Sequence, residues 1–331
     1  MFKWIKRIAL GAGVLAGVLV VFGIAFEQWS RWKVSREYPP IGQLFEVDGR
    51  YVHLYCSGTG APTVVLQSGL DALGSLSWAS VQPEIAKTNR VCSYDRAGIL
   101  WSDGRDNLPS ANQITERLHS LLGVASEKPP YVMVGHSLGG PLTMVFADRY
   151  RDEIEGIVLV DSAHPAQESR FSPELITAMG GPPSPLILKV MAATGLLRLL
   201  DSGSADGDPE EVQLALKYFP QSVRGVLSEI AAMEEMLGEP YEAGSFGELP
   251  LIVLTAGKLP DELPPGMTPE LTEEISNVWS ELQIELTALS TSGEQRVIDD
   301  ATHYIQYDNP DAVIAAIRDV VTASQQTIQK N

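Results

Sequence analysis

The stretch that most limits the possible folds of this chain is the pentapeptide GHSLG at residues 135–139, which has the pattern G-x-S-x-G. The apolar run Tyr131–Val134 leads directly into it, and a stretch with helical spacing, Leu138–Arg149, follows directly. In such a strand-to-helix turn a serine is exposed above the edge of a sheet, and the flanking glycines let strand and helix approach closely. This context favours a reactive serine over one that only caps the helix. Ser137 is therefore the candidate nucleophile.

Strand-like and helix-like segments alternate along most of the chain. Gln43–Val47 and Tyr51–Cys56 predict a hairpin, because Asp48-Gly49 between them is a strong turn signal. Several later strand-like runs are continuously apolar, as strands buried on both faces are. This alternation favours a mostly parallel sheet with helices on both faces. The other predicted elements are strands at Thr63–Gln67, Arg90–Tyr94, Tyr131–Val134, Ile157–Val160, Leu251–Thr255 and Gln295–Ile298, and helices at Ile114–Leu122, Leu138–Arg149, Glu273–Leu289 and Asp311–Ala323.

One block, residues 165–249, breaks the alternation because it contains no strand-like run. It holds helical segments instead, at Leu186–Leu200, Pro209–Phe219 and Ser222–Leu237. Since the block lies between two core strands, we predict that it forms a helical lid. Its apolar positions, such as Leu186, fit packing over a pocket, and they fit packing of the lid upon itself equally well.

The segment Ile8–Phe26 carries no charged residue. At about 1.5 Å of rise per residue, a helix of this length spans the roughly 30 Å hydrocarbon core of a bilayer. A cleaved signal peptide has a shorter apolar region, of about 7–15 residues, followed by small residues at the cleavage site. We therefore predict an uncleaved membrane anchor and linker at residues 1–37, followed by a single domain at residues 38–331.

The charge distribution bears on orientation and on partners. Lys3, Lys6 and Arg7 precede the apolar segment, so the positive-inside rule favours a cytoplasmic N-terminus and an extracytoplasmic domain, although further basic residues follow the segment. The net charge is −18, and these three basic residues lie in the anchor, so the domain itself is still more acidic. An acidic domain without a basic stripe is repelled by phosphate backbones, which argues against nucleic-acid binding.

A serine hydroxyl is a weak nucleophile and needs a general base. The chain has five histidines. His53 and His119 lie in a predicted strand and a predicted helix, and the backbone directs His136, the neighbour of the serine, away from it. His164 follows its strand too soon to leave room for an acid in the usual order. His303 lies between the last predicted strand and the terminal helix, and the chain order serine, acid, histidine selects it.

The acid that orients this histidine is less well defined by the sequence. Asp261 lies on the loop after the strand Leu251–Thr255, where a carboxylate can reach the imidazole N–H and fix its tautomer. Glu262 is next to it, and Asp161 ends the preceding strand. By its place in the chain order Asp261 is favoured, and Asp161 and Glu262 remain alternatives.

Two backbone amides are candidates for holding an oxyanion. The N–H of Leu138 lies at the start of the helix after the serine, where the helix dipole favours negative charge. The N–H of Leu70 follows Gly69 in the turn after the strand Thr63–Gln67. A turn glycine at this position lets the next amide face a pocket, although a turn without a catalytic role has the same sequence.

Taken in order, these motifs resemble the α/β-hydrolase superfamily, over about residues 43–323. The likeness rests on SGL at 68–70, SYDRAG at 93–98, GHSLGG at 135–140, LVDS at 159–162 and the position of His303. It implies a mostly parallel sheet of about eight strands with helices on both faces and an inserted helical lid. It also implies the lid-bearing branch of serine hydrolases, which includes esterases, lipases and peptidases.

The chain departs from the family pattern in places. Leu100 stands where a second glycine usually follows the Asp-Arg-x-Gly turn, Thr302 replaces the glycine before the histidine, and Asp261 lies one position later than the usual acid. Because of the last departure, Asp161 and Glu262 remain alternatives to Asp261 as the acid.

The family's strand order implies that the second and fourth strands are neighbours, which would bring Cys56 and Cys92 together. They would form a disulfide in an extracytoplasmic domain and remain buried thiols in the cytosol.

The expected function is hydrolysis of an ester, thioester or amide through an acyl-enzyme, with Ser137, His303 and Asp261 as the catalytic residues and Leu70 and Leu138 as the oxyanion donors. The expected partner is a small-molecule acyl substrate, apolar if the lid covers it, and the expected location is a membrane. No cofactor or metal is implied. Acyl transfer on the same triad, or a non-catalytic membrane-tethered binding protein on this scaffold, are the alternatives.

Overall fold

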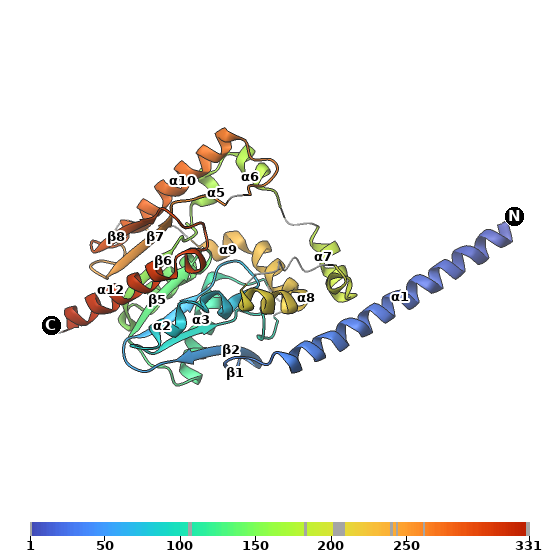
Figure 1. Cartoon of the computed structure of the whole chain (residues 1–331), viewed down its shortest axis with the longest axis horizontal. Helices are drawn as coiled ribbons and strands as arrows, with labels where there is room; N and C mark the ends of the chain where they lie inside the picture. Colours follow the sequence, from blue (N-terminus) through green and yellow to red (C-terminus); the bar gives the residue numbers. More distant parts are fainter. Residues whose placement is uncertain are drawn as a thin grey trace.

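A twisted eight-stranded sheet forms the centre of the molecule (Figure 1). The structure is a computed structural model, and it describes residues 2–104, 108–181, 184–200, 209–238, 241–242, 244–260 and 262–328. The strand order is β1-β2-β4-β3-β5-β6-β7-β8. The strands are β1 (Gln43–Val47), β2 (Arg50–Ser57), β3 (Thr63–Gln67), β4 (Val91–Tyr94), β5 (Tyr131–His136), β6 (Ile154–Val160), β7 (Leu251–Ala256) and β8 (Gly293–Ile298).

The first two strands form the predicted hairpin at one edge of the sheet. Val47 pairs with Arg50, and Asp48 and Gly49 between them have φ angles of 53° and 71°. Two left-handed residues in a row define the turn that best matches the twist of a two-residue hairpin. β2 is also antiparallel to β4, whereas every pair from β4 to β8 is parallel. The predicted mostly parallel sheet is confirmed.

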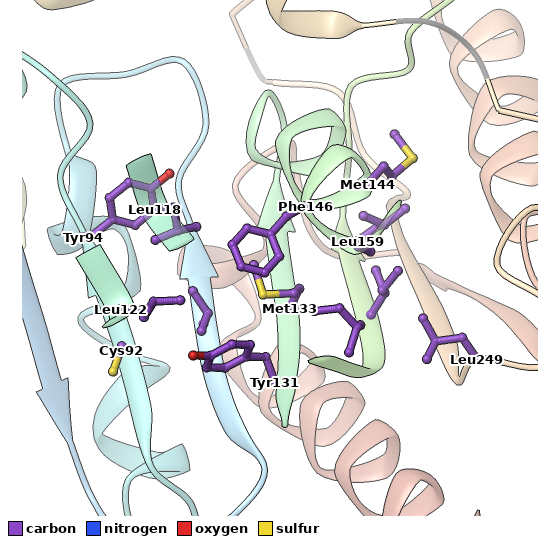
Figure 2. Packing of buried hydrophobic residues seen from close by; sticks show 14 of the residues in the cluster. Cys92, Tyr94, Leu118, Leu122, Tyr131, Met133, Met144, Phe146, Leu159 and Leu249 are labelled. Atoms are coloured by element: carbon purple, nitrogen blue, oxygen red, sulfur yellow. The ribbon is translucent and has the colours of Figure 1, made fainter. Parts of the chain in front are cut away.

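Helices cover both faces of the sheet, as the buried apolar strands require. One face carries α2 (Gln82–Ile85) and α12 (Pro310–Ile328), and the other carries α3 (Ala111–Val124), α4 (Gly139–Arg149) and α10 (Pro269–Thr287). Figure 2 shows the core on the second face, where the side chains of α3 and α4 meet those of β5. Residues labelled there include Tyr131 and Met133 of β5, Leu118 and Leu122 of α3 and Phe146 of α4.

A helical insertion between β6 and β7 extends beyond the carboxyl edge of the sheet. Its elements are α5 (Gln167–Arg170), α6 (Pro173–Met179), α7 (Pro185–Ala193), the 3₁₀ turn η3 (Leu196–Arg198), α8 (Glu210–Ala231) and α9 (Met233–Leu237). In Figure 1, α5 and α6 lie beside α10, whereas α7 lies beside the N-terminal helix.

The insertion differs from the predicted pair of helices with a break near residue 220. A single helix, α8, continues through Pro220. Proline removes one helical hydrogen bond and usually kinks or ends a helix. Here tertiary contacts hold the helix at and after this position. Pro220 is buried, Ser222 Oγ accepts from the N–H of Leu100 at 3.0 Å, and Gly225 packs against the backbone of Gly98.

The N-terminal helix α1 (Phe2–Glu37) projects away from the sheet as a long rod (Figure 1). In the described part of the chain it is the one helix whose length and composition suit a membrane span. The predicted linker after residue 26 is helical and continues this rod. The helix ends where the N–H of Tyr38 bonds to the carbonyl of Val34 at 2.8 Å, because Pro39 and Pro40 follow.

Cys56 of β2 and Cys92 of β4 face each other in the antiparallel register and form a disulfide. The strand order implied by the family resemblance is therefore present. Among the described residues, these two cysteines and Glu127 form a cluster whose potential metal-ligand atoms lie within 4.8 Å of one another. Both sulfurs are used by the disulfide, so this cluster is not a metal site.

Candidate active site

Ser137 lies in the tight turn between β5 and α4, with a φ angle of 50°. A positive φ is uncommon for a residue with a side chain and costs free energy, so the surroundings must hold the turn in place. The N–H of Ser137 donates to the carbonyl of Val160 at 3.1 Å, and its own carbonyl accepts from the N–H groups of Gly140 at 2.9 Å and Ala163 at 3.0 Å. The turn thus ties three neighbouring segments together at the carboxyl edge of the sheet.

The glycines on both sides of the serine are required by close packing. A Cβ atom on Gly135 would overlap the carbonyl oxygen of Gly139, and one on Gly139 would overlap the carbonyl oxygen of Gln67. The start of α4 therefore lies directly against the ends of β3 and β5. The side chain of Ser137 stays partly exposed, whereas Leu138, the next residue, is buried at the start of the helix.

His303 lies on the loop after β8, and its Nδ1 atom is 2.6 Å from Oδ2 of Asp161. Asp161 ends β6 in a left-handed conformation, with φ 40°, and is 2% exposed. Its other oxygen, Oδ1, accepts from the N–H of Ala256 and from the indole Nε1–H of Trp279, both at 2.9 Å. A carboxylate held by two further donors is an acceptor for His303 Nδ1–H, which leaves the Nε2 atom of His303 as the basic nitrogen.

A second histidine connects the loop of His303 to the turn of Ser137. The Nε2–H of His136 donates to the backbone carbonyl of His303 at 2.9 Å, and the two ring centroids are 4.8 Å apart. Burial lowers the pKa of His136 well below its usual value, and the nearby His303 lowers it further. His136 is therefore neutral and can hold its proton on Nε2 for this bond. Because Ser137 follows directly, this contact brings the histidine loop to the serine turn.

The turn after β3 runs alongside the serine. An ideal Cβ atom on Gly69 would lie 3.0 Å from Cβ of Ser137. Arg96, from the loop after β4, donates to the carbonyl oxygens of Ser68 at 2.7 Å and Gly69 at 2.6 Å. In a trans peptide the carbonyl and the next N–H point in opposite directions, so Arg96 turns the N–H of Leu70 away from itself.

Arg96 is itself held by the insertion. Glu229 of α8 accepts from Arg96 Nε at 2.7 Å and from Nη2 at 2.8 Å, and both side chains are 3% exposed. A bidentate pair of this kind fixes the plane of the guanidinium. Arg96 belongs to the SYDRAG motif at 93–98, whereas Glu229 belongs to none of the motifs. An acidic residue in an amphipathic helix usually faces solvent, so the sequence carries no signal for this contact.

Asp71, directly after Leu70, is another residue that the sequence did not single out. Its Oδ1 atom accepts from the N–H groups of Leu73 at 2.8 Å and Gly74 at 3.3 Å. Its Oδ2 atom is buried and has no hydrogen-bond partner among the described residues. Desolvation by burial raises the pKa of Asp71 from 3.8 to about 6, against the opposing effect of these two backbone hydrogen bonds.

The sequence offered three candidates for the acid. Asp261 lies outside the described residues. Glu262 is exposed to solvent. Asp161, an alternative to Asp261 in the sequence analysis, is the carboxylate that the structure pairs with His303. The signal that could have found it is its position at the carboxyl end of a buried strand next to the serine strand.

The remaining histidines have separate partners. His53 and Asp95 form a fully buried pair, with 2.9 Å between Nδ1 and Oδ2. His119 contacts Glu153 at 3.1 Å. His164 faces Glu285 at a longer distance of 3.6 Å.

A cavity of about 560 Å³ lies between α3, α8 and the loop after β4. Its lining includes Arg96 and Glu229 but neither Ser137 nor His303.

Comparisons with known proteins agree with this fold. The chain is 26% identical to the uncharacterized protein YqjL of Bacillus subtilis (strain 168) over 288 residues, covering 86% of this chain and 93% of that protein. It is also 26% identical to the uncharacterized protein YbdG of the same strain, but it spans only 48% of that relative. Among solved structures, that of a membrane phospholipase A aligns with a TM-score of 0.60 at 15% identity, covering 98% of this chain and 99% of that chain.

A family model provides the identification. Residues 54–316 match the model described as the alpha/beta hydrolase family, which covers most of the sheet, the insertion and the loop of His303. The match agrees with the resemblance found in the sequence motifs and with the strand order of the structure. This chain belongs to the alpha/beta hydrolase family.

Proposed function

We propose that this protein is a serine hydrolase that cleaves an acyl ester through an acyl-enzyme, with Ser137 as nucleophile, His303 as general base and Asp161 as the acid that orients His303. The observation that carries the proposal is the 2.6 Å contact between Asp161 and His303, on a loop that is bonded to the serine turn through His136. Acyl transfer requires a serine and a base that a carboxylate orients, and the bonded loop and turn support this assignment.

The chemistry follows from the positions of the protons. His303 donates Nδ1–H to Asp161, so its Nε2 lone pair accepts the proton as Ser137 Oγ attacks the substrate carbonyl carbon. The imidazolium formed then protonates the leaving group, and the carbonyl reforms as an acyl-enzyme. Water, deprotonated by the same nitrogen, attacks the acyl carbon and releases the acid, and the proton returns to Ser137. Atoms and charges balance without a cofactor.

The oxyanion formed in each step needs fixed donors. We assign this role to the backbone N–H groups of Leu138 and Leu70. Leu138 lies at the N-terminus of α4, where unpaired N–H groups and the helix dipole favour an anion. The orientation of the Leu70 amide is supported by Arg96, which holds the carbonyl of Gly69 on the opposite side of the peptide.

We further propose that residues 1–37 anchor the enzyme in a membrane and that the insertion at residues 165–249 acts as its lid. The length and composition of α1 support the anchor. The disulfide between Cys56 and Cys92 supports an extracytoplasmic domain, because disulfides persist in oxidising compartments. An enzyme held at a bilayer meets apolar acyl esters there, and the likeness in fold to a membrane phospholipase A is consistent with such a substrate.

The test is hydrolysis of a series of p-nitrophenyl esters of increasing acyl length by the full chain in detergent. Ser137→Ala should lose at least about 10³-fold in kcat on every ester, because no other group supplies the attacking oxygen. Ser126→Ala is the matched control, since Ser126 is also a serine with positive φ, 63°, and is exposed in a turn after α3. Activity that survives in Ser137→Ala would refute the proposal.

A further inference from the structure

The helix α7 and the 3₁₀ turn η3 have one packed face and one open face. Leu188, Ala192 and Leu197 pack against α8. The opposite side chains are between 44% and 71% exposed, although they are large and apolar. We call them the outer face: Leu186, Ile187, Val190, Leu196, Leu199 and Leu200. A soluble surface rarely carries so many adjacent apolar side chains, because each one left exposed forgoes the stabilisation of burial.

The helix α7, which carries part of this outer face, lies beside α1 (Figure 1). The backbone of Thr194, after α7, touches α1 at Gly23, where a Cβ atom would overlap the Thr194 carbonyl oxygen. Gly195, with φ 68°, approaches Phe26 in the same way. Gly23 is three residues before the end of the uncharged segment 8–26, which is about 4.5 Å along a helix axis. The contact therefore lies within the segment that we propose to span the membrane.

An ion-pair network holds this contact in place. Glu27, the first charged residue after the apolar segment, is fully buried. It accepts from Arg198 of η3, through Nε at 2.6 Å and Nη2 at 3.1 Å, and from Nε of Arg31 at 2.7 Å. A buried carboxylate with these partners is costly to separate from them, because the charges would remain without compensation. The insertion is thus fixed to the anchor at the level where the apolar segment ends.

The charge of this region also differs from that of the rest of the protein. Residues 184–200 contain Lys189 and Arg198 and no acidic residue, in a chain whose net charge is −18. An apolar face flanked by cations and free of acids is the pattern of helices that lie in the interface of a bilayer, buried by about 5–10 Å.

From these four observations we infer that the outer face of α7 and η3 is embedded in the lipid bilayer beside α1. The partner is the acyl and headgroup boundary of the membrane, and the lid is thereby held against the surface from which an apolar substrate would come. This inference rests on the proposed membrane anchoring of α1, but it does not require that Ser137 be catalytic.

The experiment uses the full chain in vesicles of phosphatidylcholine and phosphatidylglycerol, with one fluorophore attached to a single introduced cysteine. The two native cysteines are bonded to each other, so they do not react. Leu186→Cys and Leu199→Cys report on the outer face. Val14→Cys, in α1, reports on the anchor, and Val297→Cys, on β8 far from the anchor, is an exposed control at 54%.

Brominated lipids should quench the fluorophore at 186 and 199 roughly twofold or more, as they should at 14, and aqueous iodide should quench only the one at 297. Quenching by brominated lipid at 14 but by iodide at 186 and 199 would refute the embedded face and leave the anchor intact. No lipid quenching at 14 would refute the anchor itself. Protection of 186 and 199 from both quenchers would show that protein covers the face, as in a pair of chains, and would also refute the inference.

Discussion

Oδ2 of Asp161 lies 2.6 Å from Nδ1 of His303, although 142 residues separate them in the chain. The contact is possible because β6, β7 and β8 are parallel neighbours, so the loops that follow β6 and β8 emerge at the same edge of the sheet. At the end of β7, the N–H of Ala256 donates to the other carboxylate oxygen of Asp161 at 2.9 Å. Asp161 is therefore held at the end of the sheet, whereas His303 lies on a loop.

The first prediction concerns the identity of the acid. Asp161→Asn should lower kcat by about 10²–10⁴-fold, because an amide that donates to Nδ1 stabilises the wrong tautomer of His303. Asp261→Asn and Glu262→Gln are the matched controls and should keep kcat near that of the unchanged protein. Ester hydrolysis by the three variants, with folding checked by circular dichroism, decides between them. If Asp261→Asn were the inactive variant, the assignment of Asp161 would be wrong.

The buried pair between Arg96 and Glu229 should stabilise the fold and the turn of Leu70 together. Glu229→Gln leaves the guanidinium buried without its counter-charge, so the free energy of unfolding should fall by about 3–5 kcal/mol. Glu281→Gln removes one of the two acidic partners of Arg170, in an exposed cluster, and should change the free energy of unfolding far less. Urea unfolding in detergent measures both. If the free energy of unfolding fell equally in the two variants, burial would not make the pair of Arg96 and Glu229 more stabilising than an exposed pair.

Asp71 should make stability depend on pH. Burial raises its pKa from 3.8 to about 6, so the folded state binds a proton that the unfolded state has lost between these values. Stability contributed by the protonated group is therefore lost as the pH rises through this range. Asp71→Asn does not titrate there, so its stability relative to the unchanged protein should increase by roughly 2–3 kcal/mol between pH 4 and pH 7.

Thermal or urea unfolding at several pH values measures this difference, and the exposed Asp152→Asn variant provides the background. A difference between Asp71→Asn and the unchanged protein that stays constant from pH 4 to pH 7 would mean that Asp71 titrates normally in the folded state.

The disulfide between Cys56 and Cys92 should stabilise the hairpin edge of the sheet. It closes a loop with a sequence separation of 36, for which chain entropy gives about 3–4 kcal/mol. A reductant should lower the urea midpoint of the unchanged protein, whereas the Cys56→Ala/Cys92→Ala double variant should unfold at the lower midpoint with or without reductant. A midpoint that survives complete reduction would show that the bond adds nothing to stability.

Much of the fold could be predicted because the relevant signals are local. The buried strands are continuous apolar runs, and Asp48-Gly49 determines the hairpin turn by its own conformational preference. The turn of Ser137 is marked by glycines that adjoin it in sequence. The disulfide followed from the strand order that the family resemblance implied, and it is present in the structure.

The features that the sequence did not reveal depend on contacts between distant segments. Asp161 and Asp261 both follow strand-like runs in the sequence. The bonds from the indole of Trp279 and the amide of Ala256 to Asp161 are contacts that no local pattern reports. The partnership of Glu229 with Arg96 spans 133 residues. The continuity of α8 through Pro220 has the same origin, because packing against Leu100 and Gly98 outweighs a local preference for a break.

The most direct test of the central claim is covalent labelling of the folded protein with a fluorophosphonate, followed by peptide mass spectrometry. The reagent loses fluoride when a serine Oγ attacks phosphorus, and it reacts with serines that a neighbouring base activates. The proposal predicts a single adduct, on the peptide that carries Ser137, absent in Ser137→Ala, retained in Ser126→Ala and formed more slowly in Asp161→Asn. Folded protein that stays unlabelled, or that carries the adduct on another serine, would contradict the assignment of Ser137 as the nucleophile.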